Sequence, residues 1–210
     1  IGKQAHDDLK LQMHAEHNTV ASPAAPTVVM TQPLTAEPDD SESWAFDTSQ
    51  QMGSNHGGLY TDKNGQQWYV KVPKSEAHAR NELLAAKLYE AAGVAVPTLK
   101  LVKSGGKVAI ASQWVDGMQK GGAGIKSATG ALEGLAVDAW LANYDSVGTG
   151  YDNLLKDKDG KAVRIDVGGS LLFRAQGALK TDFGDQVNEL QSMLNPSINS
   201  YSAAVFGGIS

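Results

Sequence analysis

Residues 135–173 read LAVDAWLANYDSVGTGYDNLLKDKDGKAVRIDVGGSLLF, and the interpretation of the whole chain starts from this stretch. It holds three polar residues, Asp145, Asn153 and Asp166, that its apolar pattern does not require. The turn signal Asp159-Gly160 predicts a β-hairpin between Asn153 and Asp166. A hairpin brings the residues at its open end together, so we expect Asn153 and Asp166 to be neighbours.

The residue types at this open end favour metal-assisted chemistry. An amide oxygen beside a carboxylate suits Mg²⁺, which keeps several waters and takes further ligands from substrate phosphates. Asn153 and Asp166 are therefore the predicted metal ligands. Asp145 follows an amphipathic helix predicted over 132–143, and an aspartate placed there can accept a proton from an attacking hydroxyl. Asp152-Asn153 alone, or Asp159-Gly160 alone, would be interpreted as a plain turn. Asp145, Asn153 and Asp166 in this order are typical of phosphoryl transfer.

The predicted helix has one face of regularly spaced residues. That face carries Leu132, Leu135, Ala136, Ala139, Trp140 and Asn143.

The chain resembles the atypical kinases, most closely the group of phosphatidylinositol 3-/4-kinases, actin-fragmin kinase and HipA-like bacterial kinases. The resemblance lies in the motif Asp145…Asn153-Leu-Leu…Arg164-Ile-Asp166-Val-Gly-Gly. Its spacing differs, because seven residues separate Asp145 from Asn153 where the protein-kinase pattern H-R-D-x-x-x-x-N has four. Gly148 and Gly150 can absorb the extra length as a loop.

A Gly-rich stretch lies upstream. Gly53-Ser54-Asn55-His56-Gly57-Gly58 predicts a hairpin loop whose backbone N–H groups can approach phosphate oxygens, with Ser54 and Asn55 as further donors. It matches neither of the two standard Gly-rich phosphate motifs, and alone it would be a plain turn.

A strand and a helix follow this loop. The strand over 67–72 carries Lys71, and the helix is predicted to begin at an N-cap, Ser75, and to stop at Gly93. Glu82 lies mid-helix and is expected to face Lys71. A strand lysine is more commonly solvated, but the order of loop, strand and helix resembles the nucleotide-binding lobe of kinases.

The resemblance implies roles for these residues. Lys71 would hold the α- and β-phosphates of ATP, and Glu82 would orient it. The connector after the strands over 98–102 and 107–112 would bond the adenine edge. The implied cofactor-binding residues are Ser54, Asn55, Gly57, Gly58, Lys71, Gln113, Trp114 and Val115.

Composition limits the alternatives. The 210 residues include no cysteine, which excludes disulfides, zinc-thiolate sites and a cysteine nucleophile. Residues 1–50 hold two lysines and eight acidic residues, a net charge of −6, whereas the rest holds 16 basic and 15 acidic residues. The near-neutral remainder argues against nucleic acid binding, and no apolar run is long enough to span a bilayer.

The expected fold is α+β and two-lobed like a protein kinase, with an antiparallel sheet plus one helix in the first lobe. The second lobe would be small and mainly helical, with the catalytic hairpin. Residues 117–130, which are Gly-rich and polar, are expected to form a flexible joint or insertion before the predicted helix. We expect an acidic, Pro/Ala-rich tail or linker over 1–43, which could join a further domain, a nucleotide-binding lobe over 44–116 and a second lobe over 117–210.

The expected activity is transfer of the γ-phosphate of ATP, with Mg²⁺, to protein Ser/Thr hydroxyls in the cytoplasm. Three alternatives stay open: AMP transfer on the same fold, a lipid acceptor, and a nucleotide-binding pseudokinase. The unusual spacing of Asp145 and Asn153 favours the last, and the lack of a basic loop after Asp166 argues against an anionic lipid surface.

Overall fold

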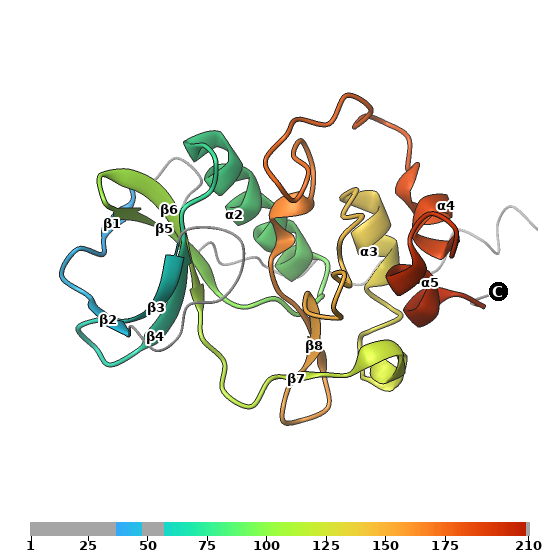
Figure 1. Ribbon diagram of the computed structural model, residues 1–210, viewed down its shortest axis with the longest axis horizontal. Coiled ribbons are helices and arrows are strands. Elements are labelled where there is room, and N and C mark those ends of the chain that lie inside the picture. Colours follow the sequence, from blue (N-terminus) through green and yellow to red (C-terminus); the bar gives the residue numbers. More distant parts are fainter. Residues whose placement is uncertain (1–36, 48–56, 209–210) are drawn as a thin grey trace, which may run out of the picture.

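A computed structural model describes residues 37–47 and 57–208 of the chain. These residues form two β-sheets and several helices. The larger sheet has the strand order β1-β5-β6-β4-β3-β2 (Figure 1). Its neighbouring strands are antiparallel except β1 and β5, which are parallel. The strands are β1 (Asp39–Asp40), β2 (Ala45–Asp47), β3 (Gly57–Thr61), β4 (Gln67–Lys71), β5 (Leu99–Ser104) and β6 (Lys107–Gln113). We call this sheet with its helix α2 the sheet region.

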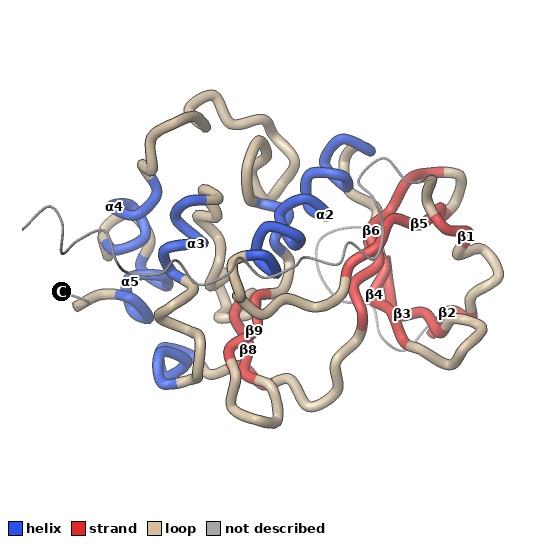
Figure 2. The backbone as a smooth tube through the Cα atoms, turned by 180° about the vertical axis from the view of Figure 1, so that it is seen from behind, coloured by secondary structure: helices blue, strands red, loops and turns tan. Residues whose placement is uncertain are grey.

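The helix α2 (Glu76–Ala91) follows β4 and carries its own start and stop signals. Ser75 Oγ accepts a hydrogen bond from the backbone N–H of His78 at 3.2 Å, which caps the first turn. Gly93, with φ +76°, ends the helix in the left-handed conformation that glycine adopts at little cost. These are the limits that the sequence predicts. Both views place α2 between the larger sheet and the other helices (Figures 1 and 2).

The smaller sheet contains the predicted hairpin. Its order is β7-β8-β9, all antiparallel, with Leu154 of β8 opposite Arg164 of β9. Gly160, with φ +82°, donates its N–H to Asp157 O and closes the turn, so the prediction of a hairpin is confirmed. The strands are β7 (Gln119–Lys120), β8 (Leu154–Lys156) and β9 (Ala162–Arg164).

Short helices complete this second half, which we call the helical region, residues 119–208. They are the 3₁₀ helices η1 (Gly122–Ser127) and η2 (Val167–Gly169) and the α-helices α3 (Leu135–Trp140), α4 (Glu189–Leu194) and α5 (Ser200–Phe206).

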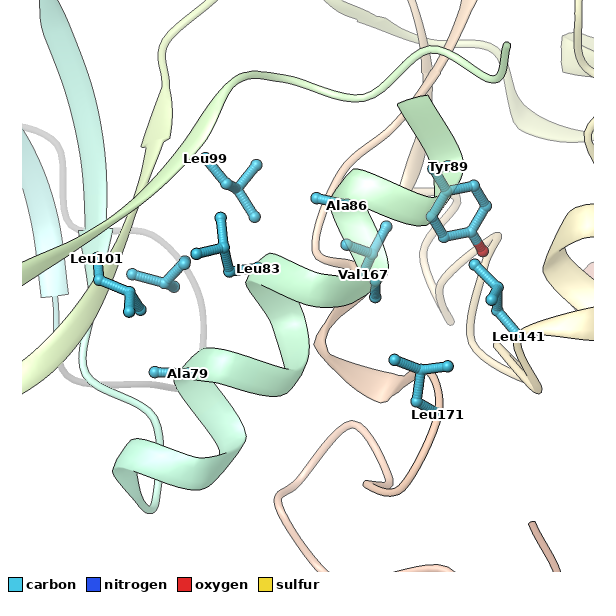
Figure 3. Packing of buried hydrophobic residues seen from close by; sticks show 11 residues of the cluster. Ala79, Leu83, Ala86, Tyr89, Leu99, Leu101, Leu141, Val167 and Leu171 are labelled. Carbon is cyan, nitrogen blue, oxygen red and sulfur yellow. The ribbon is translucent and has the colours of Figure 1, made fainter. Parts of the chain in front are cut away.

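One hydrophobic cluster joins the two regions across α2. Leu83, which is fully buried on α2, packs in the same cluster as Leu99 and Leu101 of β5. Leu141 and Leu171, from the helical region, belong to this cluster as well (Figure 3). Because α2 is covered on both sides, the regions share a core.

Three details differ from the sequence-based expectation. Strand β1 pairs with β5, so the sheet includes residues 39–40, which the sequence assigned to the tail. Residues 117–130, expected as a flexible joint, form β7 and η1 and bury Ile125. The helix predicted over 132–143 is shorter, and Trp140 on its predicted face is 55% exposed, because the buried face of α3 is formed by Leu135, Asp138 and Ala139.

The structure therefore has the mixed α/β architecture that the sequence predicts, while the division into lobes of separate function stays a prediction. Within the residues described, no helix has both the length and the apolar character needed to cross a membrane.

Candidate active site

Lys71 lies at the end of β4 in contact with two carboxylates. Its Nζ lies 2.8 Å from Glu82 Oε1 and also donates to Asp166 Oδ1. Glu82 is 3% exposed and comes from the middle of α2, and Asp166 follows β9. The predicted pairing of Lys71 with Glu82 is therefore present, and Asp166 joins it from the other region.

Burial and charge oppose each other in this cluster. Burial alone would lower the pKa of Lys71, but the carboxylates of Glu82 and Asp166 raise it above its usual value, so the amine stays charged. Burial raises the pKa of Glu82; Lys71 opposes this shift, and repulsion from Asp166 adds to it. An anionic ligand entering here would meet the fixed positive charge of Lys71 flanked by two carboxylates.

Asp166 leaves the hairpin in an unusual backbone conformation. Its φ of +52° and ψ of +59° lie in the left-handed region, which aspartate tolerates better than bulky residues. The Ile165 N–H donates to Asn153 O at 2.8 Å, which brings the two ends of the hairpin together as predicted. The Asp166 side chain is half exposed, so one side of it stays accessible to a ligand.

Asp145 and Asn153 are in direct contact despite their long separation in the sequence. Asn153 Nδ2 donates to the backbone oxygen of Asp145 at 2.9 Å and to its Oδ2 at 3.3 Å. Gly148, with φ +77°, turns the chain between them, and a side chain there would collide with Asp152 Oδ1. The extra residues thus form a closed loop rather than separating the two side chains.

The charge of Asp145 is destabilised by its surroundings. Burial, followed by repulsion from Asp166 and Asp152, raises the pKa of Asp145 to about 6, and the Asn153 hydrogen bond opposes this shift. A carboxyl whose pKa lies close to neutrality suits a group that accepts a proton.

The predicted metal ligands form an incomplete site by themselves. Asn153 uses its Nδ2 on Asp145, which leaves its Oδ1 as the atom that could face a cation. The second predicted ligand, the half-exposed Asp166 carboxylate, follows the other strand of the hairpin. No group of three His, Asp or Glu side chains arranged for a metal occurs within residues 37–47 and 57–208. The pair fits Mg²⁺, which takes one or two protein oxygens and fills its shell with water and phosphate.

The other predicted nucleotide contacts are only partly described. Ser54 and Asn55 lie outside the described residues. Gly57 is opposite Lys71 in the β3–β4 ladder, and a side chain on it would collide with the backbone oxygen of Val70. A side chain on Gly58 would collide with the Phe46 ring.

The predicted connector leads from the larger sheet to the smaller one. Gln113 ends β6, and its Nε2 donates to Gln66 Oε1 at 3.2 Å. The backbone N–H of Trp114 donates to Gln67 O, which fixes the connector to the first residue of β4. Val115 is 38% exposed. Their position between the two sheets is compatible with the predicted contact to adenine, which stays a prediction.

Sequence reasoning missed His78 and Asn81. His78 lies one helical turn before Glu82; its Nε2 is 3.0 Å from Gly168 O, and its ring stacks on Phe173. Burial lowers the pKa of His78. Asn81 Nδ2 donates to Ser170 O at 2.9 Å. The four-residue spacing of His78 and Glu82 was the available signal, since it puts both on one face of α2.

A separate cavity of about 210 Å³ lies near the C-terminal end of α2. Leu88, Trp140 and Phe183 are among its lining residues, whereas Lys71, Asp145 and Asp166 are not. It is therefore distinct from the candidate active site.

Comparison with known proteins defines the fold class. No protein-family model matches the chain, and no curated protein sequence matches it. Solved structures do match, and one of them, that of a kinase, supports a kinase-like fold for this chain.

One such structure is that of a Helicobacter pylori proinflammatory kinase, CtkA. The match has a TM-score of 0.50 and 14% sequence identity. It covers 68% of this chain and 62% of that chain, so this chain spans less than two thirds of CtkA.

Proposed function

We propose that this chain transfers the γ-phosphate of ATP, with Mg²⁺, to a protein Ser/Thr hydroxyl. The observation that carries the proposal is the position of Lys71 between Glu82 and Asp166 in a kinase-like fold. A strand, a helix and the segment after the hairpin each supply one member. A buried lysine, an orienting glutamate and a metal-binding aspartate are the parts that phosphoryl transfer in kinases requires.

Each residue has a defined task in this proposal. Lys71 binds the α- and β-phosphates, and Glu82 keeps its amine in place. Asn153 and Asp166 would hold Mg²⁺, which when bound supplies positive charge against the phosphate oxygens. Asp145 accepts the proton of the attacking hydroxyl. Most of the catalysis would come from positioning and from charge stabilisation.

The remaining ATP contacts come from the loop and the connector. Backbone N–H groups from Ser54 to Gly58 would face the phosphates, and the backbone of Gln113, Trp114 and Val115 would bond adenine. The near-neutral charge outside residues 1–50 favours a protein acceptor over an anionic lipid.

The first experiment incubates the chain with Mg²⁺ and either γ-labelled or α-labelled ATP, with and without a generic protein acceptor. Label on protein from γ-labelled ATP alone supports the proposal. Label from α-labelled ATP would show AMP transfer instead. ATP binding with no label transferred to protein from γ-labelled or α-labelled ATP would favour a pseudokinase. The long Asp145–Asn153 spacing supports this alternative.

The Asp145→Asn variant tests the base. We expect unchanged binding of Mg²⁺-ATP and a rate of transfer lowered by about 10²–10⁴-fold, the usual contribution of a general base. The matched control is Asp152→Asn, which removes a neighbouring carboxylate and should keep its rate. A normal rate in Asp145→Asn together with a lowered rate in Asp152→Asn would place the base at Asp152.

The Asp166→Ala variant tests the metal site. Mg²⁺-dependent ATP binding, measured by titration calorimetry with and without the metal, should be lost. The control is Asp159→Ala, which removes an exposed carboxylate from the turn of the same hairpin. Unchanged affinity of Asp166→Ala would reject the metal role.

A further inference from the structure

A fully buried ion pair lies beneath the candidate active site. Arg164 Nε and Nη2 donate to the two carboxylate oxygens of Asp138, both at 2.8 Å, and both side chains are 0% exposed. The same guanidinium donates to the backbone oxygens of Gly130 at 3.2 Å and Ala131 at 2.9 Å. Arg164 thus bonds through all three of its guanidinium nitrogens, an arrangement that lysine could not reproduce.

Two neutral residues extend the pair. The Tyr89 hydroxyl donates to Asp138 Oδ1 at 2.8 Å, and Asn143 Nδ2 donates to the Tyr89 hydroxyl oxygen at 3.0 Å. Burial and the Asp138 charge raise the pKa of Tyr89, so its hydroxyl remains a donor. The Asn143 backbone N–H also donates to Asp138 O at 2.8 Å. We call Tyr89, Asp138, Asn143 and Arg164 the buried polar cluster.

The cluster draws its members from three segments that also carry candidate site residues: α2, the loop before Asp145 and the end of β9 before Asp166. Tyr89 lies seven residues after Glu82, two turns along the same face of α2. Asn143 precedes Asp145 by two residues, and Arg164 precedes Asp166 by two. The backbone N–H of Arg164 also donates to Ala95 O, in the segment after α2, at 2.9 Å.

Stability alone does not explain a cluster of this kind. Taking two charges out of water is costly, and apolar side chains of similar volume often stabilise a core as well or better. The surroundings are nevertheless shaped for the guanidinium: a Cβ on Gly134 would lie 2.2 Å from Arg164 Cζ. What the cluster provides is a fixed geometry between β9, α3 and α2, with Arg164 joining β9 to α3 and Tyr89 joining α2 to α3.

We propose that the buried polar cluster is a positioning unit that fixes Asp145 and Asp166 relative to Glu82. This inference rests on the proposed phosphotransfer function. Tyr89, Asp138, Asn143 and Arg164 act through the residues that they hold, and none of them touches ATP or the acceptor.

The decisive variant is Tyr89→Phe, which removes one hydroxyl and leaves the Asp138–Arg164 pair intact. We expect kcat to fall about tenfold, because small misplacements of catalytic groups are costly, while the Kd for ATP changes less than twofold. Amide hydrogen exchange should become faster in residues 143–148 and 165–169. Unchanged kcat and unchanged exchange would overturn the inference.

The control is Val102→Ala, which opens a cavity in the core cluster of the larger sheet, a cluster that contains no residue of the helical region. It should lower the melting temperature at least as much as Tyr89→Phe, yet leave kcat and exchange in both segments unchanged when assayed below melting. An equal loss of kcat in Val102→Ala would show that Tyr89 has only a structural role. Gly134→Ala provides a second variant, with the same expected loss of kcat.

The two proposals can fail separately. If the wild-type chain transfers no phosphate, the proposed function is wrong, and exchange in residues 143–148 and 165–169 still decides whether the cluster fixes these segments. If the wild type is active and Tyr89→Phe shows normal turnover and exchange, only the positioning role is wrong.

Discussion

At the scale of single residues, the candidate site depends on a close approach that only glycine permits. A Cβ on Gly168 would lie 2.8 Å from Glu82 Oε2 and 3.3 Å from His78 Nε2. Real Cβ atoms essentially never come closer than 3.0 Å to another atom, so a side chain here would displace the glutamate. Gly168 thereby lets the segment after Asp166 lie directly against α2.

Gly168→Ala should therefore weaken the contact between Lys71 and Glu82. We expect the rate of phosphate transfer to fall roughly tenfold, because the lysine loses its fixed position. The control is Gly124→Ala, where a Cβ would meet nothing within 4 Å. Steady-state kinetics with both variants checks the prediction, and a normal rate in Gly168→Ala would contradict it.

The sequence predicts the local parts of this site better than its distant ones. The contact between the hairpin ends follows from a turn signal a few residues away, and the Lys71–Glu82 pair follows from the position of Glu82 on its helix. Arg164 and Asp138 gave no such signal, because charged residues in short strands and helices are usually solvated. Each of these two residues is buried because it pairs with the other, which lies 26 positions away along the chain.

At the scale of elements, α2 is fixed by local chemistry but positioned by residues far along the chain. Its cap at Ser75 and its stop at Gly93 can be read from the sequence. Its buried polar face cannot, because His78 and Asn81 bond residues about 90 positions later. The strand β7 within the Gly-rich stretch over 117–130 could not be predicted from local sequence either, because it forms by pairing with β8.

Lys180 connects two elements of the candidate site. Its Nζ donates to Ala142 O at 2.5 Å and to Gly169 O at 2.7 Å, so it links the loop before Asp145 to the segment after Asp166. Burial lowers the pKa of Lys180 to about 8, although Glu189 opposes this shift. The charged form of Lys180 is therefore less stable in the folded chain than in water.

This cost predicts a pH dependence of stability. Between about pH 8 and pH 10.4, the unfolded chain binds more protons at Lys180 than the folded chain, so the free energy of unfolding should rise with pH. Relative to Lys180→Met, the wild type should gain about 1 kcal/mol between pH 7.5 and 10, after allowance for solvent screening of a partly exposed amine. Urea unfolding at both values measures it.

The control for this experiment is Lys126→Met, which removes an exposed lysine from η1. Its difference from wild type should be the same at both pH values. A constant difference for Lys180→Met would contradict the assignment of the pKa shift.

At the scale of the whole molecule, the two regions should unfold as one unit. They are joined by a single connector, residues 114–118, but also by a core cluster that contains Leu83 of α2, Leu101 of β5 and Leu141 of the helical region. Loss of either region would expose the buried faces of α2. Shared burial of this kind favours a single cooperative transition.

The tryptophans allow this to be tested region by region. Trp140 lies in the helical region and is 55% exposed, so Trp140→Phe should be tolerated and leaves fluorescence to Trp44, Trp68 and Trp114. In that background, Leu141→Ala should destabilise the chain by about 2–5 kcal/mol, the usual cost of truncating a buried leucine. Although Leu141 is in the helical region, the fluorescence transition, which reports on the sheet region and the connector, should shift by the full amount.

Urea unfolding followed by fluorescence and by far-UV circular dichroism provides the comparison. The two midpoints should coincide in the parent and in Leu141→Ala. Val102→Ala, in a cluster that lies within the larger sheet, is the matched control and should also move both signals together. If Leu141→Ala left the fluorescence midpoint unchanged while the dichroism shifted, the regions would be independent, and α2 could not transmit the position of one to the other.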